Sequence, residues 1–253
     1  MKRVMLTVAY DGTNYHGWQV QPNGETIEGV LNRCLSELLQ EKIEVIGSSR
    51  TDSGVHALCN IAVFDTETSI PPEKLSYALN ARLPEDIRIQ DSKEVDSSFH
   101  PRHCDSRKTY EYRIYNASFP MPTERLYSHF SYSSFDIVRM QEAAVYFIGT
   151  HDFKSFCSVD TQAENTVRQM ENVEVLKNGN RIIIRVVGRG FLYNMVRIMA
   201  GTLMEVGKGQ LQPQEIERIL EARDRSAAGP TAPACGLTLV KYEFLGIDTL
   251  GCV

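Results

Sequence analysis

The sequence has 253 residues, of which 42% are hydrophobic and 23% are charged. A chain of this length and balance can bury a large apolar core in one or two domains, so the composition excludes global disorder. The formal net charge is -5 at pH 7. An acidic total argues mildly against a polyanionic partner, because phosphate contacts supply much of the affinity of proteins for nucleic acids.

The sequence carries no evident membrane or export signal. No apolar run approaches the ~18 residues of a membrane span, and Asp11 follows Lys2 and Arg3 too soon for the apolar core of a signal peptide. The six cysteines are scattered without a CxxC pair: Cys34, Cys59, Cys104, Cys157, Cys235 and Cys252. This spacing favours reduced thiols. We expect a soluble, cytoplasmic protein with no membrane contact.

The first half of the chain alternates strand and helix patterns. Runs rich in Val, Ile and Leu predict strands over residues 2–9, 43–48, 59–65 and 87–95. Thr26 is a good N-cap, and apolar residues recur after it at helical spacing up to Leu39. A short helix is expected after the two prolines at 71–72. The polar segment 49–54 lies between two predicted strands, so it should form a loop presented from a sheet.

The second half contains the same kinds of element. Strands are expected over residues 109–115, 173–176, 182–187 and 237–244, with a hairpin turn at Asn178-Gly179. Helices are expected over about 135–148, around 195–203, and from about Pro213. The polar stretch 97–107 is the candidate domain boundary.

This order of elements favours one fold class. Hairpins are as frequent as helical crossovers, which points to an α+β fold with mainly antiparallel sheets rather than a doubly wound parallel sheet. Each half holds several strands and two helices. We therefore expect two similar α+β domains, residues 1–103 and 104–253.

Familiar cofactor and catalytic motifs fail on spacing. The segment 201–208 has five residues between its glycines, where a P-loop has four, and the segment 188–190 lacks the third glycine of a dinucleotide site. His100, His103 and Cys104 have no second pair of metal ligands at matching spacing. No GxSxG elbow is present. We expect no cofactor and no metal.

The loop from Arg50 to His56 is the most informative polar segment. It places Arg50 two residues before Asp52, with Gly54 two residues after it, and loops on a rigid scaffold often carry function. Local sequence alone favours the interpretation that Asp52 forms an Asx turn or caps a neighbouring element. Two basic stretches are similarly open, since each could be a solvated face or a phosphate-binding surface. They are Arg102, Arg107 and Lys108 in one, and Arg181, Arg185, Arg189 and Arg197 in the other.

Blocks of residues along nearly the whole chain occur in an order and spacing that chance would rarely produce. They are YDGT at 10–13, GWQ at 17–19, RTDSGVHA at 50–57 and KTYEY at 108–112, then GTHDF at 149–153, FL at 191–192, MVR at 195–197, GTL at 201–203 and APA at 232–234. Read together, they resemble the tRNA pseudouridine synthase A family. Members of that family isomerise uridine in the anticodon stem-loop, at the expected positions 38, 39 and 40.

The resemblance implies a role for each matching residue. Asp52 corresponds to the essential aspartate, Tyr110 to the tyrosine that stacks on the target base, and Arg197 to the arginine paired with that aspartate. Uridine isomerisation needs such groups, because the C1'–N1 bond must break while sugar and base are both held. An ionised carboxylate suits the sugar side, either as a nucleophile at C1' or as a base on the 2' proton. The sequence leaves these two routes open.

The family resemblance also implies the partners. Arg50 would hold the backbone of the flipped nucleotide, and Arg102, Arg107, Lys108 and Arg189 become candidates for the tRNA-binding surface. Such a basic surface would let a chain with an acidic net charge bind RNA, because the positive charges are concentrated where the phosphates lie. The family works as a homodimer without a nucleotide cofactor, so a composite groove need not be visible in one chain. The two domain sheets should meet at a central cleft, with Asp52 from the first half and Tyr110 and Arg197 from the second.

Three positions depart from the family pattern. Ser49 stands where glycine is usual, Ser53 where alanine is commoner, and Cys235 where a polar residue is usual. They leave open a diverged paralogue with other target uridines. A non-catalytic protein that binds structured RNA is the main alternative, in which Asp52 only shapes its loop. A glycosidase or nucleosidase would need a second catalytic carboxylate, and the local loop has none.

Overall fold

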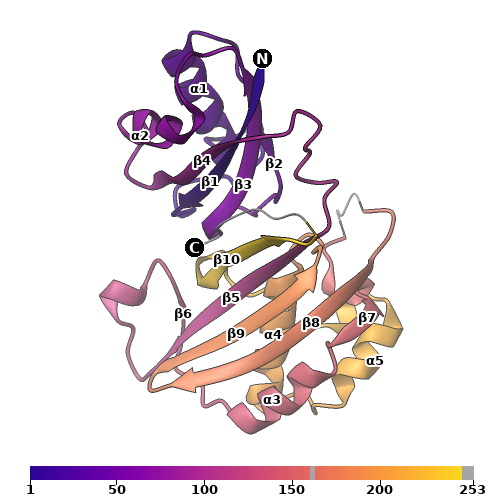
Figure 1. Cartoon of the computed structure of the whole chain (residues 1–253). Helices are drawn as coiled ribbons and strands as arrows, with labels where there is room; N and C mark the ends of the chain where they lie inside the picture. Colours follow the sequence, from indigo (N-terminus) through magenta and orange to yellow (C-terminus); the bar gives the residue numbers. More distant parts are fainter. Residues whose placement is uncertain (160–162, 247–253) are drawn as a thin grey trace. The chain divides into compact units, whose positions relative to one another are not determined.

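The computed structural model describes residues 1–159 and 163–246 (Figure 1), so Cys252 lies outside the described residues. The strands are β1 (Lys2–Tyr10), β2 (Ile46–Gly47), β3 (His56–Thr66), β4 (Ile87–Val95), β5 (Ser106–Asn116), β6 (His129–Ser131), β7 (Gly149–Asp152), β8 (Val167–Asn178), β9 (Arg181–Arg189) and β10 (Leu237–Phe244). The α-helices are α1 (Ile27–Leu39), α2 (Leu75–Asn80), α3 (Ile137–Val145), α4 (Met195–Gly207) and α5 (Glu215–Ala222).

The chain divides into two compact units. The first holds Met1–Ser106 together with the chain from Leu239, and the second holds Arg107–Thr238. The predicted division into domains 1–103 and 104–253, with separate roles, stays a prediction. Each unit has its own strands, helices and buried side chains.

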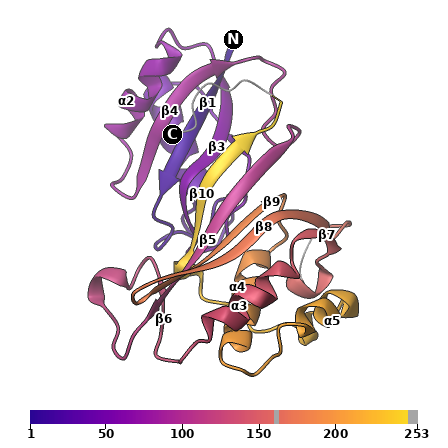
Figure 2. The same cartoon turned by 60° about the horizontal axis from the view of Figure 1, so that its bottom comes forward.

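In the first unit a sheet in the order β4-β1-β3-β10 is covered on one face by α1 and α2 (Figures 1 and 2). β1 runs antiparallel to both β3 and β4, and β2 is antiparallel to β3. α1 begins where the sequence predicts, because the Thr26 side chain accepts a hydrogen bond from the Gly29 amide. In the same unit, one group of buried apolar side chains packs together: Met5, Cys59, Ile61, Val63, Tyr242 and Phe244.

In the second unit the strand order is β5-β9-β8-β7, with all three neighbouring pairs antiparallel. β6 pairs with β5 in the parallel sense. α3 packs against β8 and against α4, and both helices lie on one face of the sheet (Figure 2). α4 supplies much of the buried surface, because every residue of this helix except Arg197 and Glu205 is buried.

The predicted fold class is confirmed as α+β with a mixed, mainly antiparallel sheet. The strand expected over 43–48 is only the two residues of β2, because side chains of α1 take over its backbone bonds. The Ile43 and Val45 amides donate to Ser36 Oγ and Asn32 Oδ1, at 2.9 and 2.8 Å. The predicted hairpin forms, but its turn residues are Gly179 and Asn180, because Asn178 already pairs with Arg181.

Two further observations concern the whole described chain. Among residues 1–159 and 163–246, no helix has the length and apolar character needed to cross a membrane. Within the same residues, no three His, Cys, Asp or Glu side chains are grouped so that they could hold a metal ion.

Candidate active site

The loop that carries Asp52 is clamped by the block of residues that follows β1. The Trp18 amide donates to Thr51 O at 3.1 Å, and the Gly54 amide donates to Tyr15 O at 3.2 Å. Ser53 Oγ also donates to Tyr15 O, at 3.2 Å. The first bond joins the GWQ block to the RTDSGVHA block, and Tyr10 and Gly12 of the YDGT block bond Thr51 and His56, so the three motifs form one local structure in the first unit.

Gly17 makes this clamp possible. Its φ is +82°, in the region that favours glycine. A Cβ at this position would lie 2.7 Å from Thr51 O, too close for any side chain. The close approach of the two segments therefore requires glycine at position 17.

A buried neutral network lies under the loop. Tyr10 Oη and Thr51 Oγ1 are 2.7 Å apart, and Asn60 Nδ2 donates to Tyr10 Oη at 3.3 Å and to Ser49 O at 3.0 Å. Burial raises the pKa of Tyr10, so the phenol stays protonated. The network fixes the backbone on both sides of Arg50 with neutral groups, and Asp52 itself is only partly buried at the surface of the loop.

The far end of the loop is fixed by His56, which is 4% exposed. Its Nδ1 accepts from the Gly12 amide at 3.1 Å and lies 3.1 Å from Asp11 Oδ1. Val55 N closes a turn on Asp52 O at 3.1 Å. This is a backbone turn, whereas the Asx turn that local sequence also allows would use the Asp52 side chain as acceptor, so that alternative stays a prediction.

Two of the predicted RNA-binding arginines are neighbours in the first unit. Arg102 Nε donates to Gly47 O at 2.7 Å. Burial and the charge of Arg50 both lower the pKa of Arg102, in that order of importance. The Arg50 side chain is exposed. These two residues, 52 positions apart in sequence, give the first unit a local concentration of positive charge.

In the second unit, Tyr110 lies on β5 and is 7% exposed. Its ring meets the ring of Phe191 edge to face, with centroids 4.9 Å apart and planes at 75°. The backbone of Tyr110 pairs with Val186 on β9. The aromatic ring is thus held by a central strand pair and by an aromatic neighbour.

Arg197 lies in the first turn of α4 and is fixed by neutral oxygens. Its Nε donates to Ala232 O and its Nη1 to Asn194 Oδ1, both at 2.7 Å. Asn194 adopts φ +60° and is itself anchored, because its Nδ2 donates to Ser158 Oγ at 2.7 Å. Sequence reasoning missed Asn194; the polar residue just before a helix is the signal that could have found it.

The loop 229–234 packs closely on α4. A Cβ on Gly201 would lie 1.8 Å from Pro230 O, and the Gly229 amide donates to Thr202 Oγ1 at 3.0 Å. The Tyr112 hydroxyl donates to Pro233 O at 2.9 Å. The GTL and APA blocks are therefore the two sides of one packed contact that positions Arg197.

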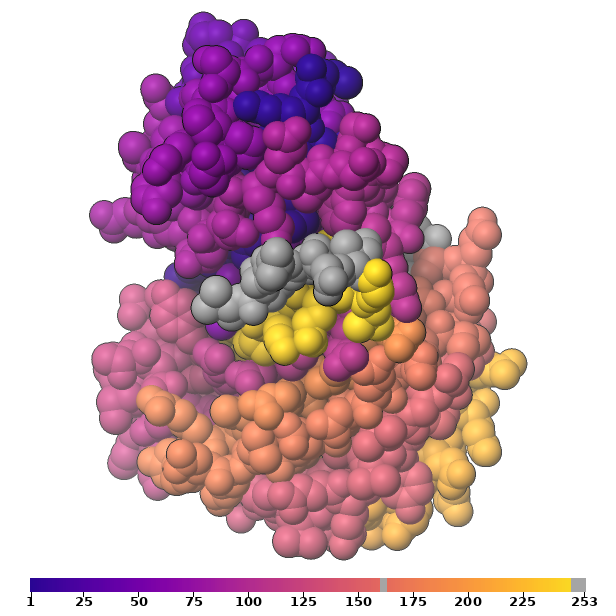
Figure 3. Space-filling view, viewed as in Figure 1, coloured from indigo at the N-terminus to yellow at the C-terminus, as the bar shows by residue number. Residues whose placement is uncertain are grey.

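The basic stretch on β9 is largely neutralised by glutamates. Arg185 bonds Glu111 and Glu174, which face it from the neighbouring strands, and Arg181 bonds Glu124. Arg107 and Arg189 share Glu171, at 2.9 and 2.8 Å. Figure 3 shows this hairpin, coloured salmon to orange, at the surface. The arginine-rich composition of the segment thus coexists with an equally acidic neighbourhood.

The three departures from the family pattern are accommodated locally. Ser53 gains the bond to Tyr15 O described above, and Cys235 Sγ donates to Ser128 O at 3.5 Å. Burial raises the pKa of the Cys235 thiol. The Ser49 hydroxyl is buried and has no hydrogen-bond partner among the residues that the structure describes.

Comparison with known proteins agrees with the motifs. A family model described as tRNA pseudouridine synthase matches residues 6–104 and 143–244. The tRNA pseudouridine synthase A of Thermoanaerobacter sp. (strain X514) is 48% identical over 245 residues, 96% of this chain and 100% of the relative. The proteins of that name from Acetivibrio thermocellus and Geotalea uraniireducens are each 47% identical over 244 residues, with the same coverage. One solved structure, a Cbf5-Nop10-Gar1 complex, has 15% identity and a TM-score of 0.31 over 80% of this chain and 54% of that chain.

These matches decide the family. The matched segments and the full-length relatives identify an RNA-modifying isomerase, and the chain belongs to the tRNA pseudouridine synthase family. The family and enzyme class predicted from the sequence blocks are thereby confirmed. The roles of Asp52, Tyr110, Arg197 and the RNA-binding side chains stay predictions.

Proposed function

We propose that the chain converts uridine to pseudouridine in the anticodon stem-loop of tRNA, at positions 38, 39 and 40. One observation carries this proposal. The three motif blocks around Asp52 are joined by hydrogen bonds into a rigid loop. The chain that carries this loop matches proteins named tRNA pseudouridine synthase A over their full length. A protein that only bound RNA would not need the loop that carries Asp52 to be held this rigidly.

The chemistry balances as an isomerisation. The C1'–N1 bond breaks, the uracil turns, C1' bonds to C5, the C5 proton is lost and N1 gains a proton, so no atom is added to the tRNA. Asp52 supplies the carboxylate on the sugar side. It acts either by attack on C1' or by removal of the 2' proton, and both routes require the ionised form.

Tyr110 and Arg197 supply the other two groups. The Tyr110 ring, buried and braced by Phe191, gives a flat apolar surface for the uracil. The Arg197 guanidinium, held by Asn194 and Ala232, favours a charged carboxylate near it. We propose that all three act on one nucleotide, which requires the two halves of the chain to meet at a central cleft.

The remaining predictions follow from the same proposal. Arg50 and Arg102, which lie near each other, contact the RNA backbone, together with Arg107, Lys108 and Arg189. The chain acts as a homodimer in the cytoplasm, where one tRNA touches both subunits, and it needs no nucleotide cofactor. Ser49, Ser53 and Cys235 leave the choice of target uridines open to a diverged paralogue.

Tritium release from tRNA labelled at uridine C5 tests this function. We expect release by the wild type and none by Asp52→Asn, whose affinity for tRNA should stay within about twofold because the amide keeps the size of the carboxylate. Primer extension after carbodiimide treatment then maps the modified positions. Equal release by both proteins would contradict the role of Asp52, and tight binding without release from unmodified tRNAs would favour a non-catalytic RNA-binding protein.

A further inference from the structure

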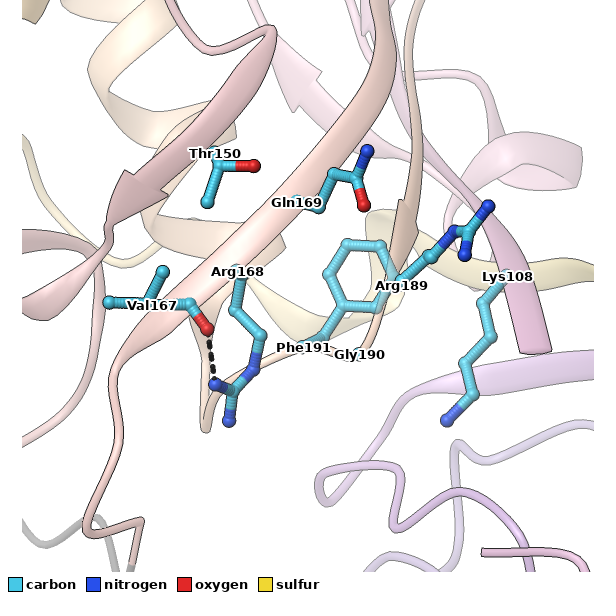
Figure 4. Close-up of a pocket in the computed structure, with 8 residues that line it drawn as sticks. All are labelled: Lys108, Thr150, Val167, Arg168, Gln169, Arg189, Gly190 and Phe191. Atoms are coloured by element: carbon cyan, nitrogen blue, oxygen red, sulfur yellow. Dashed lines mark hydrogen bonds between the residues drawn. The ribbon is translucent and has the colours of Figure 1, made fainter. Parts of the chain in front are cut away.

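An open hollow lies at one end of the sheet of the second unit (Figure 4). It is formed where β9 ends, where β8 begins and beside the start of β5. The residues that carry the argument are Lys108, Arg168, Gln169, Arg189, Gly190 and Phe191. Only Lys108 and Arg189 among them are predicted from the sequence to touch RNA.

The strand register explains why these side chains gather. Lys108 pairs with Gly188, and Gln169 pairs with Arg189, so three strands end in line. A register shift between Met170 and Asn172 bends β8 at this end. Gly190 then turns the chain with φ +77°, and a Cβ there would lie 3.5 Å from Arg168 Cδ and Nε. The turn brings Phe191 back over the hollow beside Arg168.

The charges in the hollow all have one sign. The residues that line it include three cations, Lys108, Arg168 and Arg189, and no carboxylate. Arg189 is bonded to Glu171, which does not line the hollow. The lining therefore presents positive charge together with the amide of Gln169.

Arg168 differs from the arginines on the outer face of the β5-β9-β8 sheet, such as Arg113 and Arg185, which are bonded to glutamates. Its Nη1 donates to Asn165 O at 2.9 Å and to Val167 O at 2.7 Å. Across residues 1–159 and 163–246 it has no carboxylate within 4.0 Å, whereas Arg185 on the next strand has two. Partial burial lowers the pKa of Arg168. A guanidinium that is held in place by carbonyls and has no carboxylate beside it among the described residues is suited to an external anion.

An aromatic ring completes the hollow. Phe191 meets Tyr110 edge to face, and in Figure 4 its ring lies between the side chains of Arg168 and Arg189. A ring flanked by guanidinium groups is the combination that proteins use for a nucleotide, in which the base or sugar contacts the ring and the phosphate contacts the cations.

We propose that this hollow binds a phosphodiester of the substrate RNA, next to the nucleotide that contacts Tyr110, with Arg168 as the main phosphate ligand. The inference rests on the proposed function, because it places the hollow beside the base that Tyr110 holds. It adds a ligand, Arg168, that the sequence blocks do not include, and it makes Phe191 a contact for the adjoining nucleotide.

The test uses the full chain with Arg168→Gln and measures the dissociation constant for tRNA across a range of salt concentrations. We expect the affinity for tRNA to fall about tenfold. The slope of log K against log salt should become shallower by the amount that corresponds to about one phosphate contact. The matched control is Arg113→Gln, since Arg113 lies on the outer face and bonds Glu111 at 3.0 Å. That control should leave both the affinity and the slope unchanged.

A second variant guards against a folding defect. Arg168→Gln could melt at a temperature well below that of the wild type. Lys108→Gln then serves as the test, because it changes a side chain on another strand of the same hollow. We expect Lys108→Gln also to make the salt dependence of tRNA binding shallower. An unchanged slope for both variants would overturn the proposal. Inorganic phosphate should compete with tRNA only weakly, because the site holds one phosphate of a longer chain; complete competition at low millimolar phosphate would contradict an RNA subsite.

Turnover separates this inference from the proposed function. If the wild type releases tritium and Arg168→Gln keeps wild-type affinity and slope, only the hollow proposal fails. If the wild type releases none while Arg168→Gln loses affinity and slope, the hollow binds RNA and the isomerase proposal fails. With both correct, kcat/KM falls about tenfold in Arg168→Gln while kcat at saturating tRNA changes little.

Discussion

The Asp52 loop and the outer face of the β5-β9-β8 sheet hold polar side chains in opposite ways. The loop is fixed by neutral groups, namely Tyr10, Thr51 and Asn60 beneath it, and its carboxylate is left at the surface. On the outer face, each arginine is bound by a glutamate, as Arg185 is by Glu111. The loop is therefore positioned by uncharged hydrogen bonds, whereas the arginines of the outer face are positioned by opposite charges.

This difference predicts how mutations in the two regions change activity and stability. Changes in the neutral support should cost more activity than stability, because they shift groups that must be held to a fraction of an ångström. Changes among the exposed ion pairs should cost little of either, because such pairs contribute about 0–1 kcal/mol. Arg197, held by Asn194 Oδ1 and Ala232 O, belongs with the first group.

The largest expected effect is that of Arg197→Gln. Loss of the guanidinium should lower kcat/KM on the order of 10²- to 10³-fold, as for other removed electrostatic partners. It should also move the acid limb of the pH–rate profile to higher pH, since a carboxylate without a nearby cation is more easily protonated. Arg197→Lys should restore the acid limb and part of the rate. A profile that does not move would contradict the pairing of Arg197 with the catalytic carboxylate.

Gly17→Ala should have the next largest effect. The added Cβ would strain a residue at φ +82° and clash with Thr51 O, so activity should fall about 10²-fold with a stability loss of about 1–3 kcal/mol. Gly179→Ala is the control, because its φ is +56° but nothing lies within 4 Å. Thermal melts and tritium release on both variants check this. Equal activity of the two would mean that the clamp does not position the loop.

Tyr10→Phe should have an intermediate effect. It leaves Thr51 and Asn60 short of a buried partner, which should cost about 1–3 kcal/mol of stability and about tenfold in activity. Tyr242→Phe removes another buried hydroxyl of the first unit, which donates to Pro101 O at 3.2 Å. That control should lose similar stability while its activity stays at the wild-type level. Parallel activity losses would show that general destabilisation, and not loop position, governs turnover.

Arg185→Gln should have the smallest effect. The change removes its ion pairs with Glu111 and Glu174 on a half-exposed face, so stability should fall by about 1 kcal/mol or less. Affinity for tRNA and its salt dependence should not change. A drop in the salt slope, measured by filter binding, would show that Arg185 itself contacts phosphate despite its two glutamates.

Local signals explain how much of the fold could be predicted. α1 was predictable because its N-cap and its apolar stripe lie in one stretch, and β4 matches its predicted range of 87–95. β7 was missed because its four residues are partly exposed and show no alternation. β6 was missed for a related reason, since it has only three residues and these show no strand pattern of their own.

The site divides in the same way. Sequence blocks identified Asp52, Tyr110 and Arg197 as candidates, because each sits in a contiguous motif. They could not identify the bond between Tyr10 and Asn60, which are 50 positions apart. Nor could they separate Arg168 from Arg185, since what distinguishes the two is whether glutamates of neighbouring strands lie opposite. Only the strand register supplies that information.

The nucleoside composition of tRNA after incubation with the protein tests the central claim most directly. The tRNA is digested to nucleosides and separated by liquid chromatography with mass detection. We predict that pseudouridine appears in an amount equal to the uridine lost, with intact tRNA and no free uracil. Release of uracil would indicate a nucleosidase, and unchanged uridine in several unmodified tRNAs that bind tightly would contradict an isomerase.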